Sequence, residues 1–239
     1  MIPSFFKPPM VQWPLKFEQK LMRTQSPMLR AFYQTPLPNA TTPLAEVPFV
    51  ALDFETTGLD PRKDDIITIG LVPFDLNRIY LNQARHWTLR PSRNLDEKSI
   101  VIHGITHSDI QDAPDLIEVL PTLLNALAGK ITVVHYRRIE REFLNNAVKN
   151  RIGEGIEFPV LDTLDIEQRI QEKLTGGLWN QLKGKKPASV RLGQSRQRYG
   201  LPYYSPHHAL TDAIATAELL QAQIAHFYKA AKPVGELWR

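Results

Sequence analysis

Two acidic residues, Asp53 and Glu55, follow an apolar run at residues 49–52. Side chains alternate along a β-strand, so these two carboxylates point to the same face of the strand that we expect here. Carboxylates held side by side repel each other unless a proton or a cation lies between them. Mg²⁺ and Mn²⁺ suit that place because they prefer oxygen ligands. The spacing favours a divalent-cation site, with ordinary acids of a turn as the alternative.

A second pair of acids, Glu140 and Glu142, lies on a predicted helix over residues 138–151 that follows a short apolar strand. Ile139 and Phe143 belong to the apolar face of that helix. Glu140 borders this face, whereas Glu142 points away from it. Glu140 is therefore the better candidate for a second ligand position, although both acids would also suit a solvated helix face.

Asp212 and His207 form the third candidate site. Asp212 lies in a predicted helix over residues 209–230 that is rich in Ala, Ile and Leu. An acid on such an apolar face is either paired or a ligand. His207 precedes the helix and could reach whatever Asp212 binds, although a histidine is also an ordinary residue at a helix start. The three sites together, rather than any one alone, favour catalysis.

The elements that must position these residues follow from the apolar pattern. Apolar runs predict strands at 49–53, 66–72, 85–89 and 131–134, with a further short strand near Val160. Helical spacing predicts helices at 116–127, 138–151, 164–174, 190–199 and 209–230. Short gaps allow the first three strands to pair as an antiparallel meander. This order predicts an α/β domain built on a mixed sheet.

Composition excludes several classes of protein. The chain has 239 residues, of which 43% are apolar and 23% charged, close to the averages of soluble globular proteins. It has no cysteine, which excludes disulfides, thiolate zinc sites, iron–sulfur clusters and a cysteine nucleophile. No apolar run approaches the ~20 residues of a membrane-spanning helix, and the start lacks the continuous apolar segment of a secretory signal. We therefore expect a cytoplasmic protein without membrane contact.

Charge is distributed unevenly along the chain. Residues 1–45 carry a net charge of +4 and residues 46–178 a net charge of −6, whereas residues 179–206 hold six basic side chains and no acid. A basic stretch beside an acidic centre favours a polyanionic substrate, with a solvated surface as the alternative. Tyr199, Tyr203 and Tyr204 interleave with arginines there, and Trp179 precedes three lysines. Such residues can guide a single strand, or the tyrosines can pack in the core.

Taken together, the motifs resemble the DEDDh exonuclease family, which includes the proofreading epsilon subunit of bacterial DNA polymerase III, ribonuclease T and oligoribonuclease. The resemblance covers roughly residues 47–228. It rests on five stretches in the family's order: FVALDFETTGLD at 49–60, IHGIT at 102–106, HYRRIEREFL at 135–144, LDTL at 161–164 and HHALTDA at 207–213. It implies a ribonuclease-H-like fold with a mixed five-stranded sheet flanked by helices, in agreement with the predicted element order.

The resemblance also implies roles for the candidate residues. Asp53 and Glu55 match the first metal-binding pair, Asp212 matches the last carboxylate ligand, and His207 matches the general base. The remaining carboxylate ligand aligns with Glu140, although the family usually has aspartate there, in the pattern H-N-x-x-F-D. Glutamate reaches about one methylene further, and metal geometry is sensitive at that scale. We therefore expect activity that is weaker or shifted towards Mn²⁺.

The implied reaction is phosphodiester hydrolysis with two divalent cations, Mg²⁺ or Mn²⁺. His207 would take a proton from the attacking water, and the product would be a nucleoside 5′-monophosphate cut from a 3′ end. A further group of residues matches or adjoins the family positions that contact the last two nucleotides: Thr56, Thr57, Gly58, Leu59, His103 and Ile105. For Gly58 and Leu59 a simple turn is the alternative.

We expect single-stranded DNA as the substrate, in replication or repair. An RNA-trimming exoribonuclease of the same family is one alternative. A catalytically weak nucleic-acid-binding module is the other, because Glu140 replaces the usual aspartate.

The remaining residues divide the chain into three parts. Residues 1–45 hold 8 of the 19 prolines and predict a proline-rich basic arm with one short helix from roughly Pro14 to Phe32. We expect this arm to lie on the domain or to reach a polymerase or repair protein. Residues 46–232 would form the exonuclease domain, and 233–239 a short C-terminal tail.

Overall fold

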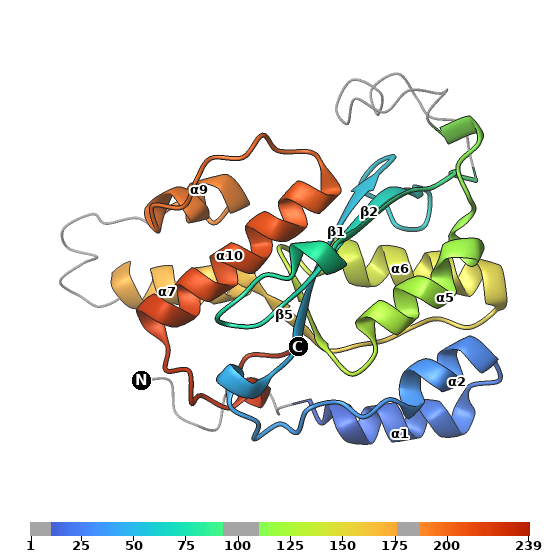
Figure 1. Cartoon of the computed structure of the whole chain (residues 1–239), viewed down its shortest axis with the longest axis horizontal. Coiled ribbons are helices and arrows are strands. Elements are labelled where there is room, and N and C mark those ends of the chain that lie inside the picture. Colours follow the sequence, from blue (N-terminus) through green and yellow to red (C-terminus); the bar gives the residue numbers. More distant parts are fainter. Residues whose placement is uncertain (1–10, 93–109, 176–186) are drawn as a thin grey trace.

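The computed structural model describes residues 11–92, 110–175 and 187–239. In these ranges a five-stranded sheet lies between two groups of helices (Figure 1), with the strand order β3-β2-β1-β4-β5. The strands are β1 (Phe49–Thr56), β2 (Ile66–Phe74), β3 (Arg85–Thr88), β4 (Ile131–Val134) and β5 (Val160–Asp162). The predicted α/β fold with a mixed five-stranded sheet is confirmed.

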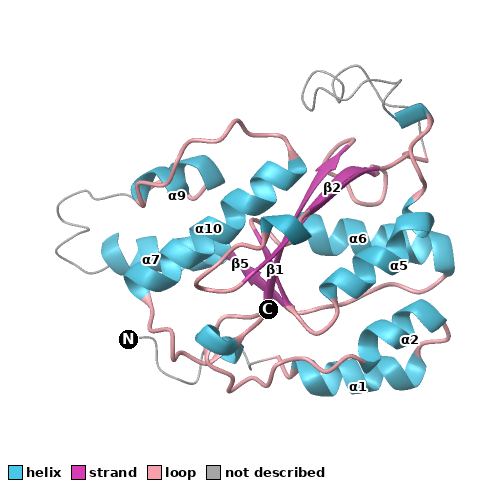
Figure 2. Cartoon of the chain, in the orientation of Figure 1, coloured by secondary structure: helices cyan, strands magenta, loops and turns pink. Residues whose placement is uncertain are grey.

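Strand pairing follows the lengths of the connections. Short links join β1, β2 and β3, which pair antiparallel. A helix lies between β3 and β4 and another between β4 and β5, and β4 pairs parallel with both β1 and β5. Every residue of β2 is buried. Helices cover both faces of the sheet (Figure 2), which explains why the two central strands are continuous apolar runs rather than alternating ones.

The helices are α1 (Trp13–Arg23), α2 (Pro27–Gln34), α5 (Leu116–Leu127), α6 (Arg138–Ile152), α7 (Thr163–Thr175), α9 (Leu192–Arg198) and α10 (Ala209–Phe227). Short 3-10 turns occupy Leu44–Glu46, Leu81–Gln83 and Val234–Glu236. Helix α10 ends three residues before the predicted end at 230.

The contact between α10 and β2 brings the end of the sheet next to the start of a helix. Gly70 on β2 faces the first residues of α10, and a Cβ at this position would lie 2.1 Å from the carbonyl carbon of Ala209. Only glycine allows this close approach. Gly70 pairs with Asp53 on β1. The glycine therefore sets the first turn of α10 beside the acidic end of β1.

The N-terminal segment forms two helices, so the single helix expected from roughly Pro14 to Phe32 is wrong. Proline inside a helix removes a backbone donor and clashes with the preceding turn, and Pro27 instead begins α2. The side chain of Glu154 caps the break, accepting hydrogen bonds from Thr24 Oγ1 at 2.6 Å and from two backbone N–H groups at 2.9 Å.

Side chains of this segment pack into the same core as the sheet. Trp13, Leu29 and Phe32 are buried in one hydrophobic cluster with the strands. The indole of Trp13 donates to the carbonyl of Arg239, and that of Trp238 donates to the carbonyl of Val11. The two ends of the described chain thus lie together. The division into an arm, an exonuclease domain and a tail remains a prediction. Among the described residues, no helix combines the length and apolar character needed to cross a membrane.

Candidate active site

Three of the predicted acids meet at one point. Asp53 and Glu55 lie on β1, and Asp212 lies in the first turn of α10. Each offers a carboxylate oxygen, and the three oxygens lie within 4.8 Å of one another. The alternation of β1 turns the first two side chains to the α10 side, as the sequence spacing indicated. Such a set of oxygen donors fits a hard divalent cation.

The electrostatics of this cluster are those of a cation site. Burial raises the pKa of Asp53 well above its usual value, and the negative charges of Glu140, Asp212 and Glu55 raise it further. Burial also raises the pKa of Asp212, an effect that the backbone N–H of His207 partly offsets. Both shifts mean that the protein disfavours these negative charges. A bound cation would remove the repulsion.

His207 is exposed, immediately before α10, with a φ of 72°. This left-handed conformation is uncommon for a residue with a side chain. It directs the backbone N–H of His207 to Oδ2 of Asp212, at 2.8 Å. A hydrogen bond from the backbone of the predicted base, His207, therefore holds the side chain of the predicted ligand, Asp212. The strained backbone conformation of His207 lies at the candidate site.

Glu140 lies in the first turn of α6 and is only 2% exposed. It is not one of the three acids that meet within 4.8 Å. Burial raises its pKa well above the usual value, and the charge of Asp162 adds to the shift. Its Oε2 is buried and has no hydrogen-bond partner among the described residues. A buried carboxylate oxygen that has no hydrogen-bond partner among the described residues, and whose charge acts on Asp53, also suits a cation site.

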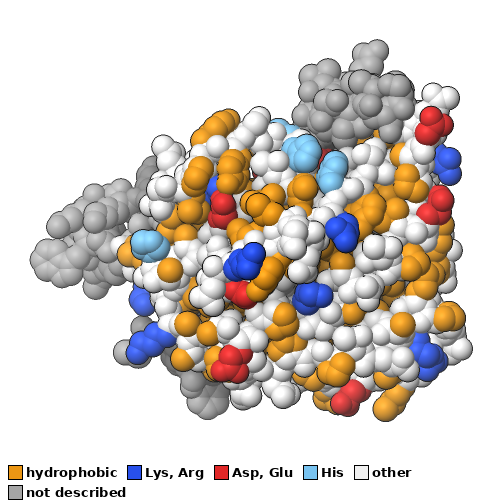
Figure 3. Space-filling model, viewed as in Figure 1, with side chains coloured by type: hydrophobic (Ala, Val, Ile, Leu, Met, Phe, Trp, Pro, Cys, Tyr) orange, Lys and Arg blue, Asp and Glu red, His pale blue; other side chains and the backbone are white. Residues whose placement is uncertain are grey.

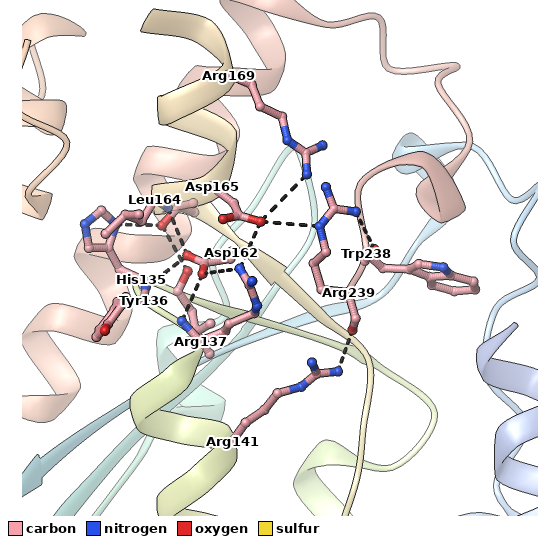
Figure 4. Close-up of polar contacts among 12 residues, drawn as sticks. His135, Tyr136, Arg137, Arg141, Asp162, Leu164, Asp165, Arg169, Trp238 and Arg239 are labelled. Atoms are coloured by element: carbon pink, nitrogen blue, oxygen red, sulfur yellow. Dashed lines mark hydrogen bonds and ion pairs between the residues drawn. The ribbon is translucent and has the colours of Figure 1, made fainter. Parts of the chain in front are cut away.

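The turn that leads to Glu140 is held by Asp162, at the end of β5 (Figure 4). This buried carboxylate accepts hydrogen bonds from the backbone N–H groups of Tyr136, Arg137 and Leu164, at 2.9, 3.0 and 3.0 Å. The Arg137 guanidinium bonds it as well, at 3.1 Å. Tyr136 has a φ of 85°, a second left-handed residue at this site. Asp162 therefore fixes the start of α6 and the place of Glu140.

Residues 50–220 match a family model described as exonuclease. The chain belongs to this exonuclease family. The match confirms the family resemblance drawn from the sequence motifs.

Two curated relatives illustrate the exonuclease family. A PolC-type DNA polymerase III of Thermotoga petrophila is 32% identical over 203 residues, covering 84% of this chain and 13% of the polymerase. A DNA polymerase III epsilon subunit of Treponema pallidum is 30% identical over 184 residues, covering 77% of this chain and 79% of that subunit. The chain thus spans about an eighth of the length of the polymerase.

A solved structure shows the same fold at low identity. The nuclease domain of 3′hExo, described as a DEDDh family member bound to rAMP, superposes with a TM-score of 0.60 at 16% identity. The match covers 75% of this chain and 92% of that domain.

The positions matched to nucleotide-contacting residues of the exonuclease family lie at the end of β1 and in the loop after it. Thr56 is buried and its hydroxyl donates to the carbonyl of Gly58 at 2.6 Å, which closes the turn. Leu59 is 83% exposed, as a side chain that meets a ligand would be. Thr57 holds the far end of the loop, accepting from the backbone N–H of Asp65 at 2.9 Å. His103 and Ile105 lie outside the described residues.

The basic stretch divides into internal and exposed parts. Arg198 and Tyr199 both bond the buried carboxylate of Glu167, and the buried Arg196 pairs with Glu218. Although burial raises the pKa of Glu167, hydrogen bonds from these and other side chains bring it below its usual value. These contacts tie α9 to α7 and α10. Trp179 and the three lysines lie outside the described residues.

The sequence interpretation missed the supporting residues Asp162 and Glu167. The LDTL stretch marked Asp162 only as part of a resemblance, and Glu167 gave no signal beyond its place on a helix. It also missed His86 on β3, whose ring stacks on that of His208 with centroids 4.7 Å apart. His208 caps α10, accepting from the backbone N–H of Thr211 at 3.3 Å. Partners on other strands cannot be recognised from local spacing.

Proposed function

We propose that this chain is a metal-dependent 3′–5′ exonuclease that releases nucleoside 5′-monophosphates from single-stranded DNA. The observation that carries the proposal is the meeting of Asp53, Glu55 and Asp212 within 4.8 Å at the end of β1. Membership of the exonuclease family supports the reaction class. Curated relatives named as DNA polymerase III chains favour DNA.

We assign the cation ligands to Asp53, Glu55 and Asp212, with Glu140 completing the set for two Mg²⁺ or Mn²⁺ ions. Bound divalent cations would polarise the phosphodiester and lower the pKa of the attacking water. His207 is the general base, because its exposure lets it meet a water at the scissile phosphate while its backbone holds Asp212. The residues that position these groups are Gly70, through the approach of α10, and Asp162, through the start of α6.

The 3′-terminal nucleotide contacts the loop at residues 56–59. Leu59 packs against its base and the backbone of Gly58 faces its sugar. Supporting this, Leu59, Tyr136, Ile139 and Phe143 line a cavity of about 190 Å³ between this loop and α6. Ile139, which lines this cavity, directly precedes the candidate cation ligand Glu140 in the chain.

An exoribonuclease is the second candidate, favoured by the rAMP named with the 3′hExo domain. A catalytically weak binding module is the third candidate, because position 140 has glutamate where the family usually has aspartate, and because Glu140 lies outside the 4.8 Å group. We propose further that a polymerase or repair protein binds the N-terminal segment, in the cytoplasm. Met22 of α1, 80% exposed, offers an apolar contact there.

A comparison of matched strands tests the function. Purified protein is given DNA and RNA oligonucleotides of one sequence, labelled at the 5′ or the 3′ end, with Mg²⁺, Mn²⁺ or chelator. We expect stepwise shortening of 5′-labelled DNA with either cation, immediate release of a labelled mononucleotide from 3′-labelled DNA, and neither in chelator. Faster shortening of RNA would support the second candidate. Binding without hydrolysis under every condition would support the third. Asp53→Asn is the control for contaminating nucleases.

A further inference from the structure

A cavity of about 310 Å³ lies between α9, the loop at residues 201–206 and the start of α10. This volume falls at the lower end of the range of small-molecule sites, ~300–1,000 Å³. Asp212 forms part of its wall, so the cavity borders the carboxylate cluster. Hydrophobic side chains gather on the surface over α9 and the start of α10, next to histidine side chains (Figure 3).

The wall combines flat aromatic surface with amide groups. Tyr203 and Tyr204 contribute rings, and Gln194 and Gln197 contribute exposed amides that can donate or accept hydrogen bonds. Leu201 adds apolar surface. Aromatic side chains bind nucleobases by stacking, and amides can pair with base edges. This set of groups therefore suits a nucleobase better than a phosphate, for which a cation would be needed.

Arg196, the one cation among the described residues of the wall, is neutralised within the protein and shapes the cavity instead. Arg196 donates to the carbonyls of Ala215 and Pro202, at 2.7 and 3.0 Å, and pairs with Glu218 at 2.6 Å. Its guanidinium lies 4.5 Å from the centre of the Tyr204 ring. Tyr204 is thus held in place, which reduces the entropy lost on binding. Tyr203, in contrast, is 86% exposed.

The direction of the strand follows from two cavities, one lined in part by Asp212 of the carboxylate cluster and one lined in part by Ile139, the neighbour of Glu140 in the chain. Residues of α6 line the smaller one, which includes Leu59, and residues of α9 line the larger one. Helices α6 and α9 lie on opposite sides of β1 (Figure 1). In the proposed function the 3′-terminal nucleotide occupies the Leu59 side and the scissile phosphate lies at the carboxylates. The strand must then continue towards α9.

We propose that the cavity between α9 and α10 binds a nucleobase of the substrate strand on the 5′ side of the scissile phosphate. The direction rests on the proposed function, whereas the binding of a base rests on the cavity itself. The site would make the enzyme depend on a base at one upstream position and would favour unpaired strands, because a paired base cannot enter a cavity.

Gly193 allows the cavity to be filled without disturbing the fold. It lines the cavity from α9, and a Cβ at this position meets no atom within 4 Å. Replacing a helical glycine with leucine also favours the helix. Gly193→Leu should therefore keep or raise the melting temperature while occupying the site. Asn150→Leu adds the same side chain at an exposed position of α6 that lines neither of these cavities, and serves as the matched control.

Binding is measured first, in chelator, by fluorescence anisotropy of a 5′-labelled oligothymidylate. Loss of a stacked base is expected to weaken binding roughly five- to hundredfold. We expect that loss in Gly193→Leu and in Tyr203→Ala, with recovery in Tyr203→Phe and no change in Asn150→Leu. Unchanged binding in both Gly193→Leu and Tyr203→Ala would overturn the inference, whether or not the wild-type protein hydrolyses DNA.

A series of oligonucleotides with a single abasic residue at successive positions then places the site. The wild-type KM should rise at one position upstream of the scissile bond, and Gly193→Leu should have a raised KM that no longer responds to that abasic residue. Equal sensitivity in wild type and Gly193→Leu would overturn the inference while leaving the nuclease proposal intact. If the wild type binds in a Gly193-dependent way but never hydrolyses, the nuclease proposal fails and the base site stands.

Discussion

The acids contributed by β1 and α10 differ in setting from the acid contributed by α6. Asp53, Glu55 and Asp212 meet within 4.8 Å at a partly open edge of the sheet. Glu140 is almost fully buried, outside that group, with an oxygen that has no partner among the described residues. The positions of the first three acids depend on the alternation of side chains along β1 and on the close approach of α10 to Gly70. The position of the Glu140 carboxylate depends on the turn that Asp162 holds and on the length of the Glu140 side chain.

The three acids that meet form one half of the candidate site, and Glu140 with its supporting turn forms the other. We expect the two halves to differ in how substitutions affect stability. In the first half, a carboxylate can be lost without loss of packing, because the cluster is repulsive when it holds no cation. In the second, the position of the acid is coupled to a network around the buried Asp162 that includes the partly exposed Arg137 and Asp165, whose guanidinium and carboxylate lie 2.9 Å apart. Variants in the two halves should therefore separate catalysis from stability.

The largest effect is expected from Asp53→Asn or Asp212→Asn. Either change removes a cation ligand, so hydrolysis in Mg²⁺ should fall below detection. The melting temperature in chelator should stay level or rise, because repulsion in the cluster is relieved. Turnover within tenfold of wild type in either variant would contradict the assignment of the cluster.

The same variant carries a pH signature. Because the pKa of Asp53 is raised in the folded protein, its ionisation destabilises the fold as the pH rises above the unfolded value, near ~3.9. The gain in melting temperature from Asp53→Asn should therefore grow as the pH rises from 4 towards the raised pKa of Asp53 and should shrink as the pH falls towards 4. Thermal melts in chelator across this range would measure it. A gain in melting temperature that grows as the pH falls would have the opposite sign and would exclude the ionisation of Asp53 as its cause.

The next effect is expected at His207. Removing a general base typically costs ~10²–10⁴-fold in rate, so His207→Ala should lose that much with cation binding largely kept. The acidic limb of the pH–rate profile should flatten or move in this variant. In His208→Ala the limb should stay, because that residue caps α10 and stacks on His86. A normal rate with an unchanged limb in His207→Ala would leave His207 with a structural role alone.

Variants of Glu140 test the second half of the candidate site directly. Glu140→Gln keeps the shape and removes the charge, so we expect a severe loss of kcat without a fall in melting temperature. Glu142, which is 46% exposed and pairs with Arg138 on the surface, is the matched control, and Glu142→Gln should do little. Glu140→Asp should retain measurable activity, with a smaller preference for Mn²⁺ over Mg²⁺ than wild type. Loss of activity in Glu142→Gln alone would place the ligand at Glu142, two residues along α6 and on a different face of the helix.

The smallest effect is expected from Arg137→Gln. It weakens the hold on Asp162 but leaves the backbone N–H bonds that fix the turn. It also removes the partly exposed ion pair with Asp165, which contributes ~0–1 kcal/mol. A total loss of ~1–2 kcal/mol corresponds to a melting-temperature decrease of ~2–8 °C in a protein of this size. The value of kcat should fall a few-fold, through a looser Glu140, while KM stays near that of wild type. A loss as large as that in Glu140→Gln would mean that Arg137 itself contacts the substrate.

Local sequence was sufficient wherever the determining interaction was local. The apolar run at 49–52 and the alternation after it predicted both the central strand and the shared face of Asp53 and Glu55, and the apolar spacing of α6 separated Glu140 from Glu142. The break in the N-terminal helix was missed although Pro27 indicated it. The cap that completes the break, Glu154, lies 130 residues away from Thr24.

The amino-acid pattern alone predicted the order of the elements, the family and the acids that could bind a cation. Folding determines that Arg196, Arg198 and Tyr199 pair with carboxylates of other helices, that Tyr203 is exposed beside a cavity, and that Glu140 lies outside the 4.8 Å group. The physical reason is that strand and helix periodicity fix which way a side chain points. Whether a charge is paired, and how near two carboxylates come, depends on partners that folding brings from distant positions in the chain.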